Sequence, residues 1–283
     1  MPALSRPSER EELLLRAALS PPSEVAGAWS RVSGAVDLGT LDSSSHALLP
    51  LVYRTLAAAG VEDPWLGRLK GVYRRTWYGN QLLLRRAGEA LGALRAEGVN
   101  AMVLGGAAVG LLHYRELGVR QMSDTSIAVR PASARRARRV LSAAGWNARP
   151  LLSGDYDLWA AGAPLDVADV RTRAPCPGDQ LLRTCANGAA LSSRRGSCRW
   201  VADAIVIVES SPGGIDWQRL VERAIGQRVV THLHLTLSYL RDAFATPVPV
   251  GVIESLGAAK TPMGLGRLHL SRGRSLVRAM RSQ

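Results

Sequence analysis

Lysine is almost missing from this strongly basic sequence. Only Lys70 and Lys260 are lysines among its 36 basic residues, so the rest are arginines, and the formal net charge is +13. Clustered basic side chains favour a polyanionic partner, because phosphates release counterions when they are neutralised. The same arginine bias, with abundant alanine, glycine and leucine, is what a GC-rich genome produces without selection for binding. Charge alone therefore allows a nucleic-acid partner but does not favour one.

Long apolar runs and closed cysteine sets are also lacking. No stretch of about 18 uncharged apolar residues occurs, and the N-terminal segment has no continuous apolar core, so neither a membrane span nor a signal peptide is predicted. We expect a cytoplasmic protein without a membrane partner. Cys176, Cys185 and Cys198 are odd in number and their spacing fits no zinc site. Reduced, buried thiols are the expectation.

The apolar pattern divides the chain into three regions. Residues 1–97 and 176–283 repeat apolar residues at helical spacing, whereas residues 98–175 alternate short apolar runs with turns and helices. The pattern predicts an α/β (α+β) fold, in which a small mixed β-sheet core lies between helical N-terminal and C-terminal regions. The run IVIV is compatible with a strand but is predicted as helix. The tail after Glu254 holds six basic residues and no acid, and we expect it to be solvated.

The middle region carries the residues that suggest chemistry. Residues 101–104 are predicted as a strand ending in a turn at Gly105 and Gly106, where backbone N–H groups can face a phosphate. A tight turn without a ligand would have the same sequence. Asp124 and Ser126 lie two apart on the next predicted strand, so their side chains share one face.

Carboxylates at these positions would form a magnesium site. Mg²⁺ prefers oxygen ligands, and a third carboxylate on a neighbouring strand would complete a two-metal site for displacement at phosphorus. Asp166, on the strand after a hairpin turn predicted at Ala161 and Gly162, is placed to be that third group. Asp124, Ser126 and Asp166 are therefore expected in one cleft, above the Gly105–Gly106 turn.

An ordered set of short motifs resembles a known family. The runs are MVLGGAAVGLLHY, RQMSDTSIAVRP, LDVADV, CRWVADAIVIV and DWQRLVERA, preceded by ALLPLVYRTLAAAG and LKGVYRRTWYGN. Together they resemble the uncharacterised nucleotidyltransferase family of bacteria, which is distantly related to polymerase-β-type transferases, over roughly residues 10 to 257. The resemblance implies a nucleotidyltransferase fold that takes Mg²⁺ and a nucleoside triphosphate.

The sequence departs from that family where the chemistry should be. Ser126 replaces an aspartate, Gly105 a lysine, and Ala168 and Asn187 replace histidines. A serine hydroxyl is neutral and a poor Mg²⁺ ligand, so the resemblance implies that Mg²⁺ and nucleotide binding is weak or lost. The residues that do match are Arg120, Asp124, Asp166, Trp200 and Asp203.

These patterns give a set of candidate site residues. Asp124, Asp166 and Ser126 are the catalytic candidates, and the first two are the metal ligands. Cofactor binding is assigned to Gly105, Gly106, Arg120 and Asp203. Structural alternatives stay open: Asp124 could be a solvated turn residue and Asp203 an ion-pair partner.

Three functions are compatible with the sequence. The first is a redeployed nucleotidyltransferase-fold protein of bacterial biosynthesis, either an accessory protein that binds a small molecule or peptide or an unconventional enzyme. The second is a weak Mg²⁺-dependent nucleotidyltransferase that moves a nucleoside monophosphate onto a small molecule. The third is a basic scaffold that binds RNA or an acidic partner. The first two have similar weight and the third less.

Overall fold

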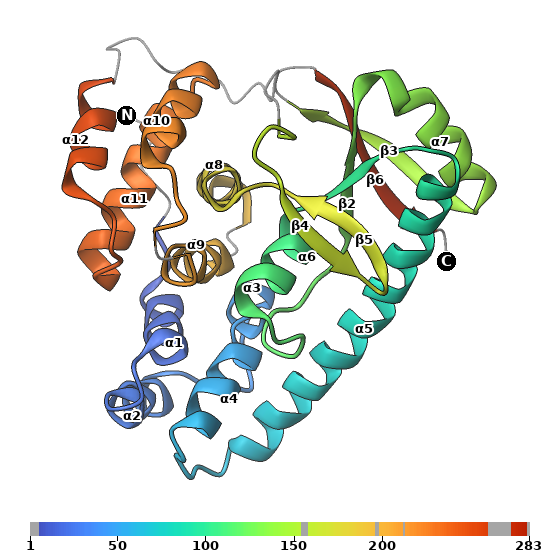
Figure 1. Cartoon of the computed structure of the whole chain (residues 1–283). Coiled ribbons are helices and arrows are strands. Elements are labelled where there is room, and N and C mark those ends of the chain that lie inside the picture. The colour runs from blue at the N-terminus through green and yellow to red at the C-terminus, as the bar shows by residue number, and fades with distance from the viewer. Residues whose placement is uncertain (1–5, 154–157, 196–197, 212, 260–272, 282–283) are drawn as a thin grey trace.

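The computed structural model describes residues 6–153, 158–195, 198–211, 213–259 and 273–281, and within these only the backbone of 147–153, 189–195 and 273–281. The chain opens with helices, and α5 runs from them along one edge of the molecule to the sheet (Figure 1). The helices before the sheet are α1 (Glu9–Leu19), α2 (Val25–Ala35), α3 (Ser43–His46), α4 (Leu49–Ala58) and α5 (Leu66–Ala96).

Local capping fixes where the first helix begins. The hydroxyl of Ser8 accepts a hydrogen bond from the Glu11 amide (3.3 Å), and the Glu11 carboxylate accepts one from the Ser8 amide (2.8 Å). This reciprocal capping box satisfies two backbone donors that a helix start leaves unpaired. Glu11 also accepts a hydrogen bond from Ser44 (2.7 Å), which in turn accepts one from the Cys198 amide (2.9 Å). The cap thereby ties α1 to helices far along the chain.

A mixed sheet follows α5, and the predicted α+β class is confirmed. The strand order is β3-β6-β2-β1-β5-β4, with β1 parallel to β5 and antiparallel to β2. Because β1 and β5 run parallel, both end at the same edge of the sheet. The strands are β1 (Ala101–Leu104), β2 (Thr125–Val129), β3 (Trp146–Ser153), β4 (Ala163–Val167), β5 (Val170–Ala174) and β6 (Gly273–Arg281).

The turn after β1 has the conformation that its glycine allows. Gly105 has φ +64°, a left-handed conformation that costs a residue with a Cβ roughly 1–2 kcal/mol. The chain then enters helical turns and reaches β2 and α7. These segments are α6 (Gly105–Val109), the π-helix Gly110–Tyr114, the 3₁₀-helix Pro131–Ser133 and α7 (Ala134–Ala143).

Helices follow β5 and build a second layer beside the sheet (Figure 1). The IVIV run lies in α9, as predicted. The buried Asp179 at the start of α8 forms ion pairs with the partly exposed Arg219 (3.1 Å) and Arg223 (3.2 Å) of α10. The helices are α8 (Pro177–Arg195), α9 (Arg199–Glu209), α10 (Trp217–Gly226), α11 (Val230–Phe244) and α12 (Val250–Ala258). None of the helices in the described ranges is long and apolar enough to cross a membrane.

Two large apolar cores and a small third cluster hold these layers together. The first joins the N-terminal helices to those after β5 and includes Leu14, Val52 and Ile205. The second lies between the sheet, α5 and α7 and includes Leu91 and Val103. The first and third regions of the sequence therefore share one core, and α5 contributes to both cores.

Two details differ from the sequence prediction. The hairpin predicted to turn at Ala161 and Gly162 falls partly on residues 154–157, which lie outside the described residues. The described hairpin joins β4 to β5 and turns at Ala168 and Asp169, with φ of 43° and 67°. The tail was expected to be solvated, but residues 273–281 form β6 between β3 and β2. The edge of β2 offers unpaired backbone groups with which β6 pairs. Pairing between segments so far apart in the chain leaves no local signal in the sequence.

The close approach of α5 to the β4–β5 turn yields a test of the packing. A Cβ on Gly88 would lie 2.7 Å from the Cβ of Ala168, so we expect Gly88→Ala to lower the free energy of unfolding by about 1–3 kcal/mol. Gly71→Ala is the matched control, because the same helix leaves open space there. It should stabilise the protein by about 0.5–1 kcal/mol. Chemical denaturation of both variants measures this, and equal shifts would contradict the packing.

Candidate functional site

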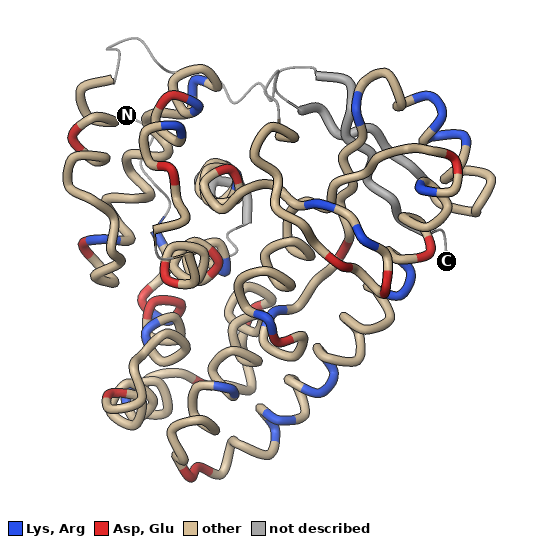
Figure 2. Tube along the Cα trace, in the orientation of Figure 1, with Lys and Arg blue, Asp and Glu red and all other residues tan. Residues whose placement is uncertain are grey.

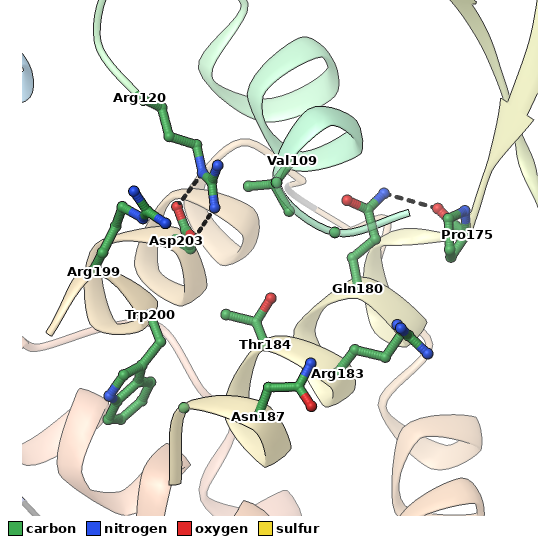
Figure 3. A pocket seen from close by; sticks show the side chains of 13 residues that line it. Val109, Arg120, Pro175, Gln180, Arg183, Thr184, Asn187, Arg199, Trp200 and Asp203 are labelled. Atoms are coloured by element: carbon green, nitrogen blue, oxygen red, sulfur yellow. Dashed lines mark hydrogen bonds and ion pairs between the residues drawn. The ribbon is translucent and has the colours of Figure 1, made fainter. Parts of the chain in front are cut away.

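A pocket of about 200 Å³ lies at the edge where β1 and β5 end. Gly105 and Gly106 follow β1 and Pro175 follows β5, while α8 and α9 supply the facing walls (Figure 3). Crevices beyond the carboxyl ends of strands are where open α/β sheets bind ligands. The lining residues are Gly105, Gly106, Val109, Arg120, Pro175, Gln180, Arg183, Thr184, Asn187, Gly188, Arg199, Trp200 and Asp203.

A buried ion pair between Arg120 and Asp203 forms one side of the pocket (Figure 3). The Arg120 Nε donates to Asp203 Oδ1 (2.8 Å) and Nη2 donates to Oδ2 (2.7 Å), and both side chains are at most 8% exposed. Burial lowers the pKa of Arg120, but Asp203 outweighs it and raises the pKa above its usual value; Tyr114 and Asp124 add smaller effects. Arg120 is therefore a fixed cation that Asp203 already compensates.

Neighbouring side chains hold this ion pair in place. Asn80 of α5, 1% exposed, donates to the carbonyls of Leu117 (2.6 Å) and Arg120 (2.7 Å) and accepts from the Met122 amide (2.9 Å). The Tyr114 hydroxyl donates to Asp203 Oδ1 (3.1 Å). Its pKa is raised well above the usual value by burial and by the Asp203 charge, so this hydroxyl keeps its proton and remains a donor.

Gly106 leaves the space that the ion pair needs. A Cβ at this position would collide with the Arg120 guanidinium. The guanidinium has little freedom to retreat, because two hydrogen bonds fix it to Asp203. Gly106 therefore allows the Arg120 guanidinium to lie against the turn because it has no side chain.

Arg199 is a second cation in the pocket, and its charge is balanced differently from that of Arg120. It lies one helical turn before Asp203 on α9, is partly exposed, and donates to the carbonyl of Gln121 (3.1 Å). Burial lowers the pKa of Arg199, and the nearby Arg120 lowers it further, although Asp203 acts in the opposite direction. Repulsion between two close guanidinium groups is relieved when an anion binds between them.

Polar groups lie on and behind the opposite wall, where Gln180 lines the pocket and His113 and Ser210 do not. Gln180 donates to the Pro175 carbonyl (2.8 Å), and His113 Nδ1 lies 2.7 Å from the Ser210 hydroxyl. His113 Nε2 and Gln180 Oε1 have no hydrogen-bond partner among the described residues. Burial lowers the pKa of His113 to about 4, and Gln180 offsets part of that effect. The His113 imidazole is therefore neutral near neutral pH, and the charge on the α8 wall comes from Arg183.

The predicted site residues do not all meet at this pocket. Gly105, Gly106, Arg120 and Asp203, the cofactor-binding candidates, all line it, although their role stays a prediction. Asn187, which stands where the family has a histidine, lines it too. Asp124 and Ser126 lie at the same edge, at the start of β2, but do not line the pocket.

Asp166 lies at the opposite end of the strands, where β1 begins rather than ends, so the expected cleft of Asp124, Ser126 and Asp166 is not formed. Asp166 pairs with Arg171 of β5, and β5 is aligned with β1 through Arg173 and Met102. This places Asp166 level with the residue before β1, whereas Ser126 pairs with Leu104 at the end of β1. Asp166 and Ser126 share a sheet face, but they lie about 13 Å apart along the strand direction. Strands β1 and β5 lie between them. The hairpin turns directly after Val167, so Asp166 stays at its closed end.

These positions do not fit a two-metal site. Ligand atoms must lie within about 2.1 Å of Mg²⁺, and Asp166 is too far from Asp124 to share ions with it. The described part of the chain holds no group of three or more acidic, histidine or cysteine side chains that could bind a metal. The three positions predicted to form the metal site therefore do not converge.

Comparison with known proteins gives one finding that bears on this site. Residues 43–156 match the family described as uncharacterised nucleotidyltransferase. This confirms the family prediction for the segment that contains α5, β1, β2 and Arg120. The match leaves out α8 and α9, which build half of the pocket. No curated protein and no solved structure matches the chain.

Several pocket residues were missed in the sequence. Arg199 and Asp203 are four apart, a spacing that places both on one face of a helix, and this signal could have joined Arg199 to the site. Gln180, Arg183 and Thr184 had no such signal. They reach the pocket only because α8 packs against the turn after β1.

The low pKa of His113 predicts a pH-dependent stability. The pKa of a histidine in an unfolded chain is about 6.5, whereas burial lowers the pKa of His113 to about 4 in the folded protein. Between these pH values the unfolded chain binds a proton at His113 and the folded protein does not. Stability should fall as pH drops through this window. His113→Asn removes the titration and should flatten the profile of melting temperature against pH, with His46→Asn at an exposed site as control. An unchanged profile in His113→Asn would contradict the buried neutral imidazole.

Proposed function

We propose that this chain is a nucleotidyltransferase-fold protein that binds a small anionic molecule, most favourably a phosphorylated one, in the pocket beside the Gly105–Gly106 turn. The proposal includes no divalent metal. The observation that carries it is Arg199, a cation held beside Arg120, whose only carboxylate neighbour in the pocket lining, Asp203, is already engaged in two hydrogen bonds.

The charge balance of the pocket supports an anion. Its lining contains Arg120, Arg183 and Arg199 against the single carboxylate of Asp203. A guanidinium donates in a planar fork that matches the oxygens of phosphate or carboxylate, and such charge-assisted hydrogen bonds are stronger than neutral ones. Phosphate fits best because it presents oxygens to more than one arginine at once.

The size and remaining walls of the pocket limit the ligand. About 200 Å³ is below the roughly 300–1,000 Å³ of pockets that bury drug-sized ligands. A small metabolite, or one phosphorylated end of a larger molecule or peptide, is therefore favoured over a fully buried nucleoside triphosphate. Thr184 and Asn187 on α8 (Figure 3) offer neutral polar groups for the rest of such a ligand.

The proposal keeps the fold's anion-binding turn and omits its metal chemistry. In a two-metal transferase, the carboxylates hold the ions that neutralise the phosphates. Here Ser126 is neutral and Asp166 is distant, while Arg199 beside the Arg120–Asp203 ion pair supplies positive charge directly. A binding or accessory role in a biosynthetic pathway accounts for the site better than the weak Mg²⁺-dependent transfer of a nucleoside monophosphate.

Calorimetric titration in EDTA tests this function. Inorganic phosphate, ribose 5-phosphate and AMP are the probes, and we expect at least one to bind. Arg199→Met keeps an unbranched apolar side chain and removes the charged guanidinium, which should weaken binding roughly tenfold or more. Arg31→Met, at an exposed position on α2, is the control with the same change in net charge.

The outcomes of this titration separate the candidate functions. Binding in EDTA that is lost in Arg199→Met supports the proposal. Absence of binding by every probe, or equal affinities in the two variants, would overturn it. Tight binding of ATP that requires Mg²⁺ would instead favour the weak transferase.

Restoring the missing carboxylate gives a second test. Ser126→Asp returns an acid next to Asp124, yet Asp166 remains at the other edge of the sheet, so two carboxylates are present rather than three. We expect Mg²⁺ affinity to stay weak and phosphate binding in EDTA to persist. A marked gain in Mg²⁺ affinity in this variant, measured by calorimetry, would show that the acidic motif still forms a metal site and would contradict the metal-free account.

A further inference from the structure

Most of the excess positive charge lies on two helices that pack together. Helices α5 and α7 carry eleven basic residues and one acidic residue, Glu89. The whole chain has 36 basic and 23 acidic residues, which leaves 25 basic against 22 acidic elsewhere. Arg136 of α7 donates to the carbonyl of Glu97 at the end of α5 (3.1 Å). In Figure 2 basic residues follow α5 and α7, whereas the helices at the other side of the molecule carry basic and acidic residues together.

This distribution argues against genome composition as the cause of the charge. A bias toward arginine codons would add basic residues throughout the chain. Instead, the rest of the molecule is nearly balanced, and the excess is confined to one structural unit. A basic stripe along one side is the electrostatic signature of polyanion binding.

The exposed face of α5 also presents aromatic side chains. Trp77 is 45% exposed, Tyr78 is 61% and Leu82 is 42%. Few other large apolar side chains are so exposed in the described ranges; the remaining two, Ile225 and Val250, lie apart on other helices. Exposing two aromatic rings on a single turn costs solvation free energy, and no packing requirement of the fold explains it.

Arginines lie one helical turn to either side of this aromatic group. Arg74 and Arg75 precede Tyr78 by three or four residues, and Arg85 and Arg86 follow Leu82 by the same spacing, so they are neighbours on the helix surface. All four are exposed. Arg85 has only a long contact with Glu89 (3.8 Å). The two arginine pairs are roughly 16 Å apart along the helix axis, a distance that a few nucleotides can span.

We propose that this face of α5, defined by Arg74, Arg75, Trp77, Tyr78, Arg85 and Arg86, binds single-stranded nucleic acid. The arginines contact successive phosphates, and the exposed rings stack on bases. Single strands are favoured over duplexes because stacking on an aromatic ring requires an accessible base face. Most of this face points away from the second apolar core, and Trp77 lies at its border, seven residues before the buried Leu84. None of its residues lines the pocket that is proposed to bind a small anion.

Fluorescence anisotropy of the full chain with labelled oligouridylate and oligothymidylate tests this proposal. We expect salt-dependent binding together with quenching of tryptophan fluorescence. Trp77→Ala/Tyr78→Ala should weaken binding roughly fivefold or more, because each stacked base contributes at least that factor. Arg75→Ala/Arg85→Ala should make the slope of log affinity against log salt shallower by about 1.4.

The controls separate this face from non-specific attraction. Arg10→Ala/Arg31→Ala removes the same charge from exposed positions on α1 and α2 and should leave the affinity nearly unchanged. Absence of binding at low salt, equal affinity in the aromatic double variant, or equal loss in the control would overturn the proposal. Equal binding of a polyglutamate peptide, with the same dependence on Trp77 and Tyr78, would also overturn it in favour of an acidic protein partner.

Discussion

Arg120 comes from the loop before β2 and Asp203 from α9, and their buried ion pair joins the sheet to the helices that follow it. Removing either partner would leave an uncompensated buried charge, which costs roughly 3–5 kcal/mol. The ion pair constrains its surroundings. Asn80 fixes the Arg120 loop, Tyr114 hydrogen-bonds to Asp203, and Gly106 must lack a side chain. It also occupies the one carboxylate of the pocket lining, so the charge of Arg199 remains available for a ligand.

Local sequence patterns predicted the fold class, the turn at Gly105 and the helix that contains IVIV. These features depend on periodicity and on glycine conformation, which a sequence displays directly. The position of β6 was not predictable, because strand pairing between distant segments depends on backbone groups common to all residues. Asp166 was misplaced for a related reason. Its strand was identified, but the turn that follows determines which edge of the sheet it reaches.

The site differs from the resemblance in an informative way. The family pattern predicted a site at three carboxylate positions. Asp124 and Ser126 lie at one end of the strands, and Asp166 lies at the other. The residues that do converge are a glycine turn, three arginines and one aspartate. Under the proposed function, such a site would contact a phosphate directly through guanidinium groups and without metal ions.

Anomalous diffraction from crystals soaked with both tungstate and Mn²⁺ tests the central claim most directly, since the two ions have separable absorption edges. Tungstate mimics a phosphate, and Mn²⁺ mimics Mg²⁺. The account predicts a tungsten peak in the pocket, within hydrogen-bonding distance of Arg199, and no manganese peak at Asp124. A manganese site on Asp124 with tungstate bound beside it, and none at Arg199, would contradict the account and restore metal-dependent chemistry to this fold.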